Sequence, residues 1–89
     1  MRRAARIDTN QPAIVAALEA IGAHVYYIKR PVDLLVGFRR RNILLEVKNK
    51  NGRDALTPDQ IEFFNTWPGE KHIVYDTNEA IHAVAGVSP

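Results

Sequence analysis

The amino-acid sequence predicts a single α/β domain in which helices flank a mixed central β-sheet. Apolar residues recur at helical spacing near the start of the chain, and three runs rich in β-branched and aromatic residues follow them. A threonine-capped helix start, a further short apolar run and a last helical pattern complete the chain. This mixture of elements in 89 residues indicates one layered domain.

The first predicted helix covers residues 10–22 and has one apolar stripe, formed by Ile14, Val15, Leu18 and Ile21. Polar residues just before it supply a cap, Pro12 fits its first turn, and Gly22 is the expected stop. Residues 24–30 are rich in aromatic and β-branched side chains, which predicts a strand that ends at Pro31.

Residues 32–38 and 43–49 are predicted to form the two strands of a hairpin. The connection between them contains Arg39 and Arg40. A two-residue turn at these arginines would need positive φ angles, which Gly and Asn adopt more readily. We therefore expect a longer loop over residues 39–42.

A polar loop at residues 49–55 precedes a second predicted helix. Thr57 is its expected N-cap, Pro58 occupies the first helical position, and Gln60 completes a capping box. A Pro-Gly pair ends this helix. Its apolar side consists of Ile61, Phe64 and Trp67.

Residues 71–75 predict the last strand, and Thr77 is expected to cap a final helix over residues 78–85. The predicted element order is therefore α-β-β-β-α-β-α. We expect one domain over residues 1–89, with a core at about residues 8–85 and a basic N-terminal arm at residues 1–7.

The composition excludes several classes of protein. The chain has no cysteine, so neither a disulfide framework nor a thiolate metal site is available. No run of about 18 apolar residues is present, so we expect no membrane span. Because no apolar signal core follows the basic start, a reducing cytoplasm is the expected location.

The net charge of +2 hides an asymmetry between the two halves of the chain. Residues 1–53 carry eleven basic and four acidic side chains, whereas residues 54–89 carry one basic and six acidic side chains. A basic half in a nearly neutral protein indicates a surface that binds a polyanion.

Asp33, Glu46 and Lys48 are the most informative residues, because they interrupt two apolar runs. A charge in such a run is costly unless it is solvated, paired or bound to a metal. Strand alternation places Glu46 and Lys48 on one face, and any hairpin loop with an even number of residues places Asp33 there too. We therefore predict that the three side chains converge.

The chemistry of the three residues fits a metal-dependent hydrolytic site. Divalent ions such as Mg²⁺ prefer carboxylate oxygens, so Asp33 and Glu46 are predicted ligands, and the carbonyl of Val47 is a third. Lys48 would orient the attacking water or neutralise charge on a phosphate. The alternative is an exposed pair of charges on a wet sheet, worth about 0–1 kcal/mol, and the complete arrangement favours the site.

These residues resemble the PD-(D/E)XK nuclease superfamily, and most of all its small stand-alone VRR-NUC type, found in phages and related to Holliday-junction resolvases. The matching segments are Pro31-Val32-Asp33, Glu46-Val47-Lys48 and Leu56-Thr57-Pro58-Asp59-Gln60. The resemblance spans about residues 8–85 and implies a restriction-endonuclease-like α-β-β-β-α-β core. It also implies Mg²⁺ or Mn²⁺ as cofactor and, for a phage-encoded protein, the host cytoplasm as location.

The resemblance implies a role for each matching residue. Asp33 and Glu46 would bind the metal, Lys48 would be catalytic, and Gln60 would lie near the site as a further catalytic residue. One departure is Val32, which separates the motif's proline from its aspartate. The proline is not a ligand, so this departure matters little.

A second departure concerns the first helix. Members of the family often carry a glutamate there that helps to hold a metal, whereas the nearest residues here are Asn10 and Gln11. We keep Gln11 as the helix-1 site residue, and we expect weaker binding of a second metal.

The sequence thus favours a metal-dependent deoxyribonuclease, an endonuclease that hydrolyses phosphodiester bonds in DNA, with branched or structured DNA among its substrates. The alternatives are a non-catalytic nucleic-acid-binding module on the same fold and a small interaction subunit. The intact trio favours the nuclease, because a protein that only binds has no need of clustered carboxylates facing a polyanion.

Two kinds of partner follow from this interpretation. Phosphate contacts dominate nucleic-acid affinity, so four basic residues are predicted to bind DNA: Arg39, Arg40, Arg41 and Lys50. A homodimer is expected as well, because two-fold symmetry matches the two strands of a duplex or junction. Trp67 is predicted to be a core residue or an anchor of that dimer.

Overall fold

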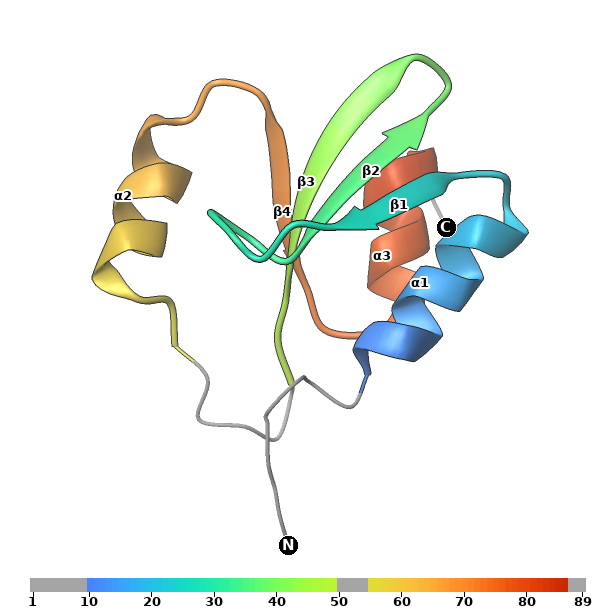
Figure 1. Ribbon diagram of the computed structural model, residues 1–89, viewed down its shortest axis with the longest axis horizontal. Coiled ribbons are helices and arrows are strands. Elements are labelled where there is room, and N and C mark those ends of the chain that lie inside the picture. Colours follow the sequence, from blue (N-terminus) through green and yellow to red (C-terminus); the bar gives the residue numbers. More distant parts are fainter. Residues whose placement is uncertain (1–9, 50–54, 87–89) are drawn as a thin grey trace, which may run out of the picture.

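The computed structural model describes residues 10–49 and 55–86, and it shows an α/β domain with one mixed sheet (Figure 1). The elements are α1 (Gln11–Ala20), β1 (His24–Tyr27), β2 (Leu34–Phe38), β3 (Arg41–Val47), α2 (Pro58–Thr66), β4 (Glu70–Val74) and α3 (Thr77–Ala85). The sheet order is β1-β2-β3-β4. The first two pairings are antiparallel and β3 pairs with β4 in parallel, so the mixed sheet and the element order are confirmed.

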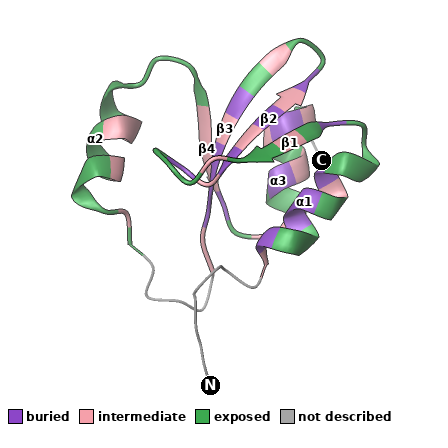
Figure 2. Cartoon of the chain, viewed as in Figure 1, coloured by how far each residue is buried: buried purple, intermediate pink, exposed green. Residues whose placement is uncertain are grey.

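Helices α1 and α3 pack together on one face of the sheet, and α2 lies on the other side (Figure 1). Every second residue of β2 is buried. In β3 the alternate residues Ile43, Leu45 and Val47 are buried, and Glu46 is buried as well. Figure 2 shows the buried positions of α1, α3 and the strands turned toward one another. The largest fully buried side chains are Ile14, Leu18, Val32, Leu34, Val36, Ile43, Leu45, Val47, Val74 and Val84. Each contributes about 1.5–3 kcal/mol by its burial.

The turn between β2 and β3 differs from our expectation of a four-residue loop. Phe38 pairs directly with Arg41, so only Arg39 and Arg40 connect the strands. Both adopt positive φ angles, 50° and 70°, as a two-residue turn between twisted strands requires. The tighter turn shifts the register of β3 against β2 by two residues, and it makes Arg41 the first residue of β3.

The helix starts and stops follow local rules, with two corrections. Asn10 is the N-cap of α1, but its side chain makes no capping hydrogen bond, so the expected polar cap is not formed. After α1, the N–H of Ala23 donates to the Leu18 carbonyl at 3.0 Å, and Gly22 has a φ of 98°, as expected for the stop. The predicted capping box of α2 is present in both directions. The cap of α3 is Asp76 rather than Thr77, because the Asp76 carboxylate accepts the N–H of Glu79 at 2.8 Å.

Helix α2 differs from the other two helices because none of its residues is buried (Figure 2). Ile61 is 48% exposed, and the following Trp67 is 47% exposed, so Trp67 is not a core residue. The ring of Trp67 stacks on Phe63 at 5.5 Å between centroids instead. Among the described residues, no helix has the length and apolar character needed to cross a membrane.

Candidate metal and catalytic site

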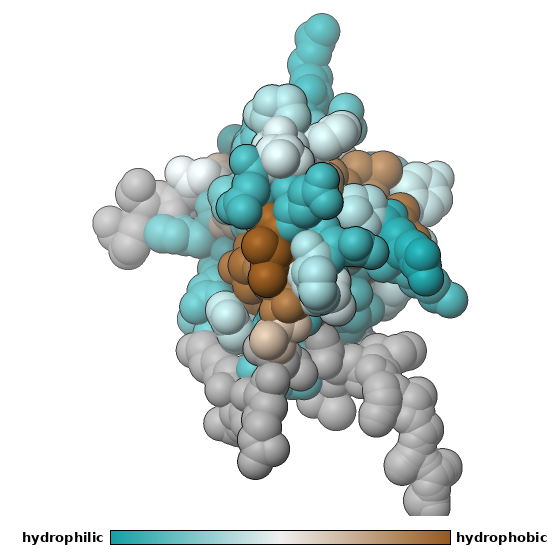
Figure 3. Space-filling model, turned by 90° about the vertical axis from the view of Figure 1, so that its left-hand side faces the viewer, coloured by the Kyte–Doolittle hydropathy of each residue, from teal (hydrophilic) through white to brown (hydrophobic). Residues whose placement is uncertain are grey.

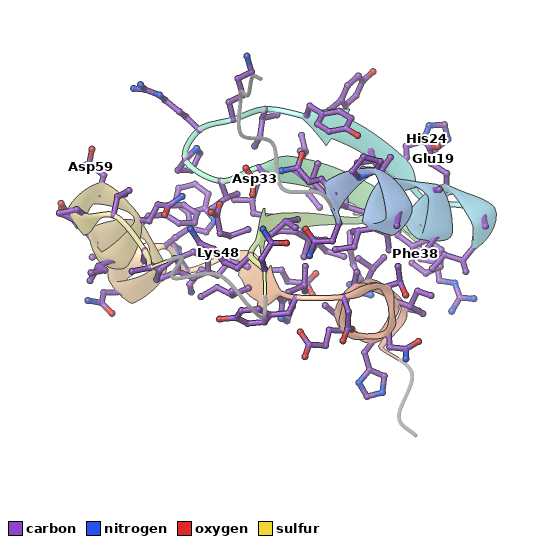
Figure 4. All side chains as sticks on the ribbon, turned by 90° about the horizontal axis from the view of Figure 1, so that it is seen from below. Glu19, His24, Asp33, Phe38, Lys48 and Asp59 are labelled. Carbon is purple, nitrogen blue, oxygen red and sulfur yellow. The ribbon has the colours of Figure 1, made fainter. Side chains whose placement is uncertain are left out.

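The structure brings Asp33, Glu46 and Lys48 together at one end of β2 and β3. The Asp33 carboxylate accepts the backbone N–H of Val47 at 2.8 Å. The Nζ of Lys48 lies 3.2 Å from Oε2 of Glu46. Figure 4 shows Asp33 and Lys48 at the same end of the sheet, on the side that faces α2. The three residues therefore form one cluster.

The register of the hairpin explains this convergence. Leu34 pairs with Leu45, so continuing the antiparallel register by one residue places Asp33 opposite Glu46. Leu34 and Leu45 point into the core, and their neighbours therefore point away from it, toward α2. The two-residue turn keeps the same parity as the longer loop, which is why the cluster forms although the predicted loop was wrong.

Glu46 lies in surroundings that oppose its charge. Glu46 is only 4% exposed, and burial raises the pKa of its carboxyl group above the ordinary value of 4.5. The negative charge of Asp33 raises this pKa further, while Lys48 and then Gln60 partly offset the increase. Oε1 of Glu46 is buried and has no hydrogen-bond partner among the described residues. Such an oxygen costs free energy unless a cation or a donor satisfies it.

Lys48 is held by several elements. Its Nζ forms an ion pair with Oε2 of Glu46 and donates a hydrogen bond to the carbonyl of Ala55 at 3.3 Å. The Lys48 side chain is only 13% exposed. Its backbone N–H donates to the Val74 carbonyl at 3.0 Å. The amide of Asn10, just before α1, donates to the Lys48 carbonyl at 3.0 Å. The lysine is thus fixed relative to both carboxylates.

Gln60 connects the start of α2 to the loop before Asp33. Its side chain accepts the N–H of Thr57 at 3.2 Å within the capping box. Its Nε2 donates to the Pro31 carbonyl at 3.4 Å. The three sequence segments that carry the nuclease resemblance therefore meet in space, with Gln60 at the edge of the carboxylate cluster.

The cluster offers a divalent ion two carboxylates and little else from side chains. Across residues 10–49 and 55–86, no three His, Cys, Asp or Glu side chains gather as a metal-binding group. Because the N–H of Val47 points to Asp33, the carbonyl of the same residue faces the same side of the strand. Two carboxylates, a carbonyl and water suit Mg²⁺ or Mn²⁺, and the orphaned Oε1 of Glu46 fits a ligand role.

The role of the predicted helix-1 residue, Gln11, stays a prediction; its neighbour Asn10 contacts the Lys48 carbonyl. Gln11 is 7% exposed at the start of α1, and no hydrogen bond joins it to Asp33, Glu46 or Lys48 within the described part of the chain.

The basic residues predicted to bind DNA are placed unevenly. Arg39 and Arg40 are exposed at the hairpin tip, and the five residues of β2 lie between them and Asp33, so the tip is about 20 Å from Asp33 along the strand. Lys50 lies outside the described residues. These positions leave the hairpin tip remote from the carboxylates.

Arg41 is partly exposed, and it contacts residues of two other elements. Its guanidinium forms a bidentate pair with Glu70 on β4, at 2.9 and 2.7 Å, and it donates to the Val84 carbonyl on α3 at 2.7 Å. Hydrogen bonds from Arg41 lower the pKa of Glu70, and Glu70 in turn raises the pKa of Arg41. The sequence gives no local signal of this pairing, because it depends on how β3 and β4 align.

Sequence reasoning also missed two basic residues beside the cluster. Lys29 and Arg30 lie in the loop between β1 and β2 instead of in the predicted strand, which stops at Tyr27. Both are exposed, and both line a cleft that also contains Gln60. A basic pair directly before a proline was the available signal.

Comparison of the chain with family models, with curated protein sequences and with solved structures found no match. The arguments on function therefore depend on the residues and on their geometry.

Proposed function

We propose that this protein is a Mg²⁺- or Mn²⁺-dependent nuclease of the PD-(D/E)XK type that hydrolyses phosphodiester bonds within DNA. The observation that carries the proposal is the surroundings of Glu46. Its carboxylate is buried beside that of Asp33, its Oε1 lacks a partner among the described residues, and Lys48 contacts its other oxygen. A stable fold gains little from two adjacent carboxylates, whereas a cation between them offsets both costs.

The residues of the cluster have separable roles in this proposal. A bound divalent ion would supply Lewis-acid activation of water and neutralise charge on the phosphate. Asp33, Glu46 and the Val47 carbonyl hold that ion. Lys48 has three N–H donors and uses two of them, on Glu46 and on Ala55. The third has no partner among the described residues, and in this proposal it is offered to the attacking water or to a phosphate oxygen, where a charged donor stabilises the transition state.

The topology supports the same proposal. The observed elements are compatible with a restriction-endonuclease-like α-β-β-β-α-β core followed by one more helix. In that arrangement the carboxylates lie where β2 begins and β3 ends, on the face turned away from α1 and α3. Helix α2 packs against this face less closely than α1 and α3 pack against the opposite face.

We also propose that the protein acts as a homodimer. The supporting observation is the side of the molecule where α2 lies, which has an apolar patch at its centre in Figure 3. Ile61 and Trp67 are each about half exposed on this side. Exposed apolar patches with a polar rim often mark interfaces between proteins. Two copies related by a two-fold axis would place one site on each strand of a duplex or junction.

A cleavage assay tests the nuclease proposal. The parent protein is incubated with branched, flapped and linear DNA, with Mn²⁺ or with EDTA. We expect cleavage with Mn²⁺ only, and we expect Glu46→Gln to abolish it. Glu62→Gln is the matched control, because Glu62 is an exposed acid of α2, and its variant should cut like the parent.

The other outcomes of this assay point to the other hypotheses. Retention of DNA without cleavage, with and without metal, would indicate a nucleic-acid-binding module. A protein that neither binds nor cuts any of the three DNA forms would indicate an interaction subunit.

A further inference from the structure

A cleft of about 590 Å³ lies beside the carboxylate cluster, between the β1–β2 loop and the start of α2. Its lining residues are Lys29, Arg30, Pro31, Thr57, Asp59 and Gln60. This volume is in the range of small-ligand sites in proteins. The side chains of this lining carry two positive charges against one negative charge, so the cleft suits an anion.

The loop that carries the two basic residues is fixed to Asp33 itself. The backbone N–H groups of Ile28 and Lys29 donate to the Asp33 carbonyl at 2.9 and 3.4 Å. The N–H of Arg30 donates to the Ile28 carbonyl at 2.8 Å. Val32 is fully buried and anchors the same loop in the core. The basic pair is therefore held at a defined position relative to the predicted metal ligand.

The backbone of this loop stores strain at Lys29. Its φ of 71° lies in the left-handed region, which non-glycine residues with long side chains seldom occupy. Strain of this kind persists where the surroundings fix it, and it clusters at binding and catalytic sites. Lys29 is also exposed, so burial of its side chain does not explain the conformation.

The position of the cleft matches the path of a polymer that passes the carboxylates. Arg30 precedes Asp33 by three residues, so no more than about 11 Å of chain separates them. Gln60 lies in the lining of the cleft and also affects the charge of Glu46. A strand with one phosphate at the carboxylates can thus place a neighbouring phosphate in the cleft.

We propose that the cleft binds a phosphate of the DNA strand next to the one that is cut, and that Lys29 and Arg30 are its ligands. This inference rests on the proposed nuclease function for the identity of the strand. It moves the DNA-binding surface from the hairpin tip to the β1–β2 loop. The two residues are binding residues: they hold the strand against the site and leave the chemistry to the carboxylates and Lys48.

Two double variants of equal charge change test this assignment. One replaces Lys29 and Arg30 by glutamine, and the other replaces Arg39 and Arg40 by glutamine. Binding of a short fluorescein-labelled DNA duplex is measured by anisotropy in EDTA, over a series of salt concentrations. Because the assay contains no metal, its result does not depend on whether the protein cleaves DNA.

We expect the Lys29/Arg30 variant to bind at least about tenfold more weakly than the hairpin variant. We also expect the magnitude of the slope of log affinity against log salt to fall by about 1, because the two residues neutralise one phosphate. The hairpin variant should keep the slope of the parent. Circular dichroism of both variants verifies that the fold is retained.

An equal loss in both variants, or a larger loss in the hairpin variant, would overturn the assignment, as would a parent protein that binds no DNA. None of these binding results tests the nuclease proposal, which the cleavage assay decides. If the parent binds DNA but fails to cut it, and the Lys29/Arg30 variant alone loses affinity, the nuclease proposal fails and the cleft assignment stands.

Discussion

At the scale of single residues, Glu46 has opposite effects on stability and on the proposed chemistry. A buried carboxylate beside Asp33 is costly in the metal-free protein, and Lys48 compensates it only at Oε2. The same arrangement prepares two oxygens for a cation. Proteins tolerate such local conflicts where function requires them, and elsewhere they avoid them.

This conflict predicts how stability changes with pH. Because the folded-state pKa of Glu46 is raised, the folded protein binds its proton more tightly than the unfolded chain does. The stabilisation of the folded protein by this tighter proton binding is complete below pH 4.5, the ordinary pKa, and it is lost as the pH rises through the raised pKa. Metal-free parent protein should therefore gain stability relative to Glu46→Gln as the pH falls from about 8 to about 5.

Urea denaturation at several pH values measures this difference. The lowered pKa of Glu70 acts in the opposite direction, but its window lies below 4.5, so the two effects separate. Glu62→Gln is the control and should follow the parent at every pH. If the free energy of unfolding varies with pH in parallel for the parent and Glu46→Gln, the pKa of Glu46 is not raised in the folded protein.

We expect the Lys48→Met variant to lose turnover while it still binds Mn²⁺. The charged donor acts chiefly in the transition state, so single-turnover cleavage at saturating DNA should fall by about 10²–10³-fold. Loss of Lys48 also removes a partner that lowers the pKa of Glu46. Mn²⁺ affinity, measured by calorimetry, should therefore persist at mildly alkaline pH and weaken on acidification.

Glu46→Ala is the contrasting variant, and it should lose Mn²⁺ affinity at every pH. If Lys48→Met cuts DNA as fast as the parent, the lysine has no catalytic role and is a surface partner of Glu46.

At the scale of elements, the hairpin shows what the sequence can and cannot predict. Alternation of apolar residues was sufficient to place Asp33, Glu46 and Lys48 on one face, because either loop length gives the same parity. The turn itself could not be predicted. Two arginines with positive φ cost about 1–2 kcal/mol each, which local reasoning counts against a two-residue turn. The compensating contacts of Arg41 come from β4 and α3, which are distant in sequence.

Helix ends were predicted better than the positions of loops. The capping box of α2 and the glycine stop of α1 depend on a few neighbouring residues, so the sequence contains the whole signal. The cleft beside the carboxylates depends on where the β1–β2 loop lies relative to α2. That relation is tertiary, and for this reason Lys29 and Arg30 were assigned to a strand rather than to the site.

We predict that the Arg41 side chain stabilises the protein by joining three elements. Its side chain on β3 joins Glu70 on β4 to the Val84 carbonyl at the end of α3. Arg41→Met should therefore lower the melting temperature, because it leaves both acceptors without their donor. Arg40→Met is the matched control, since Arg40 is exposed at the neighbouring turn position.

Thermal unfolding by circular dichroism compares the two arginine variants. Equal melting temperatures would mean that solvent replaces the Arg41 contacts at no cost, as it does for many exposed ion pairs.

At the scale of the whole molecule, the two faces of the sheet are covered unequally. Helices α1 and α3 close one face, and the core lies beneath them. On the other face α2 contributes no buried residue, although its sequence has an apolar side. The apolar surface near α2 and the carboxylate cluster thus share one side of the sheet. A dimer through this apolar surface would therefore place the two proposed sites near its interface.

The dimer gives the last prediction. The parent should have twice the monomer mass in light scattering at micromolar concentration, because a small chain gains stability by covering Ile61 and Trp67. Ile61→Lys should be monomeric, since a charge in an apolar interface leaves it desolvated and unpaired. Ala16→Lys, on the exposed side of α1, is the control and should remain dimeric. A monomeric parent, or a dimeric Ile61→Lys protein with native circular dichroism, would contradict an interface at α2.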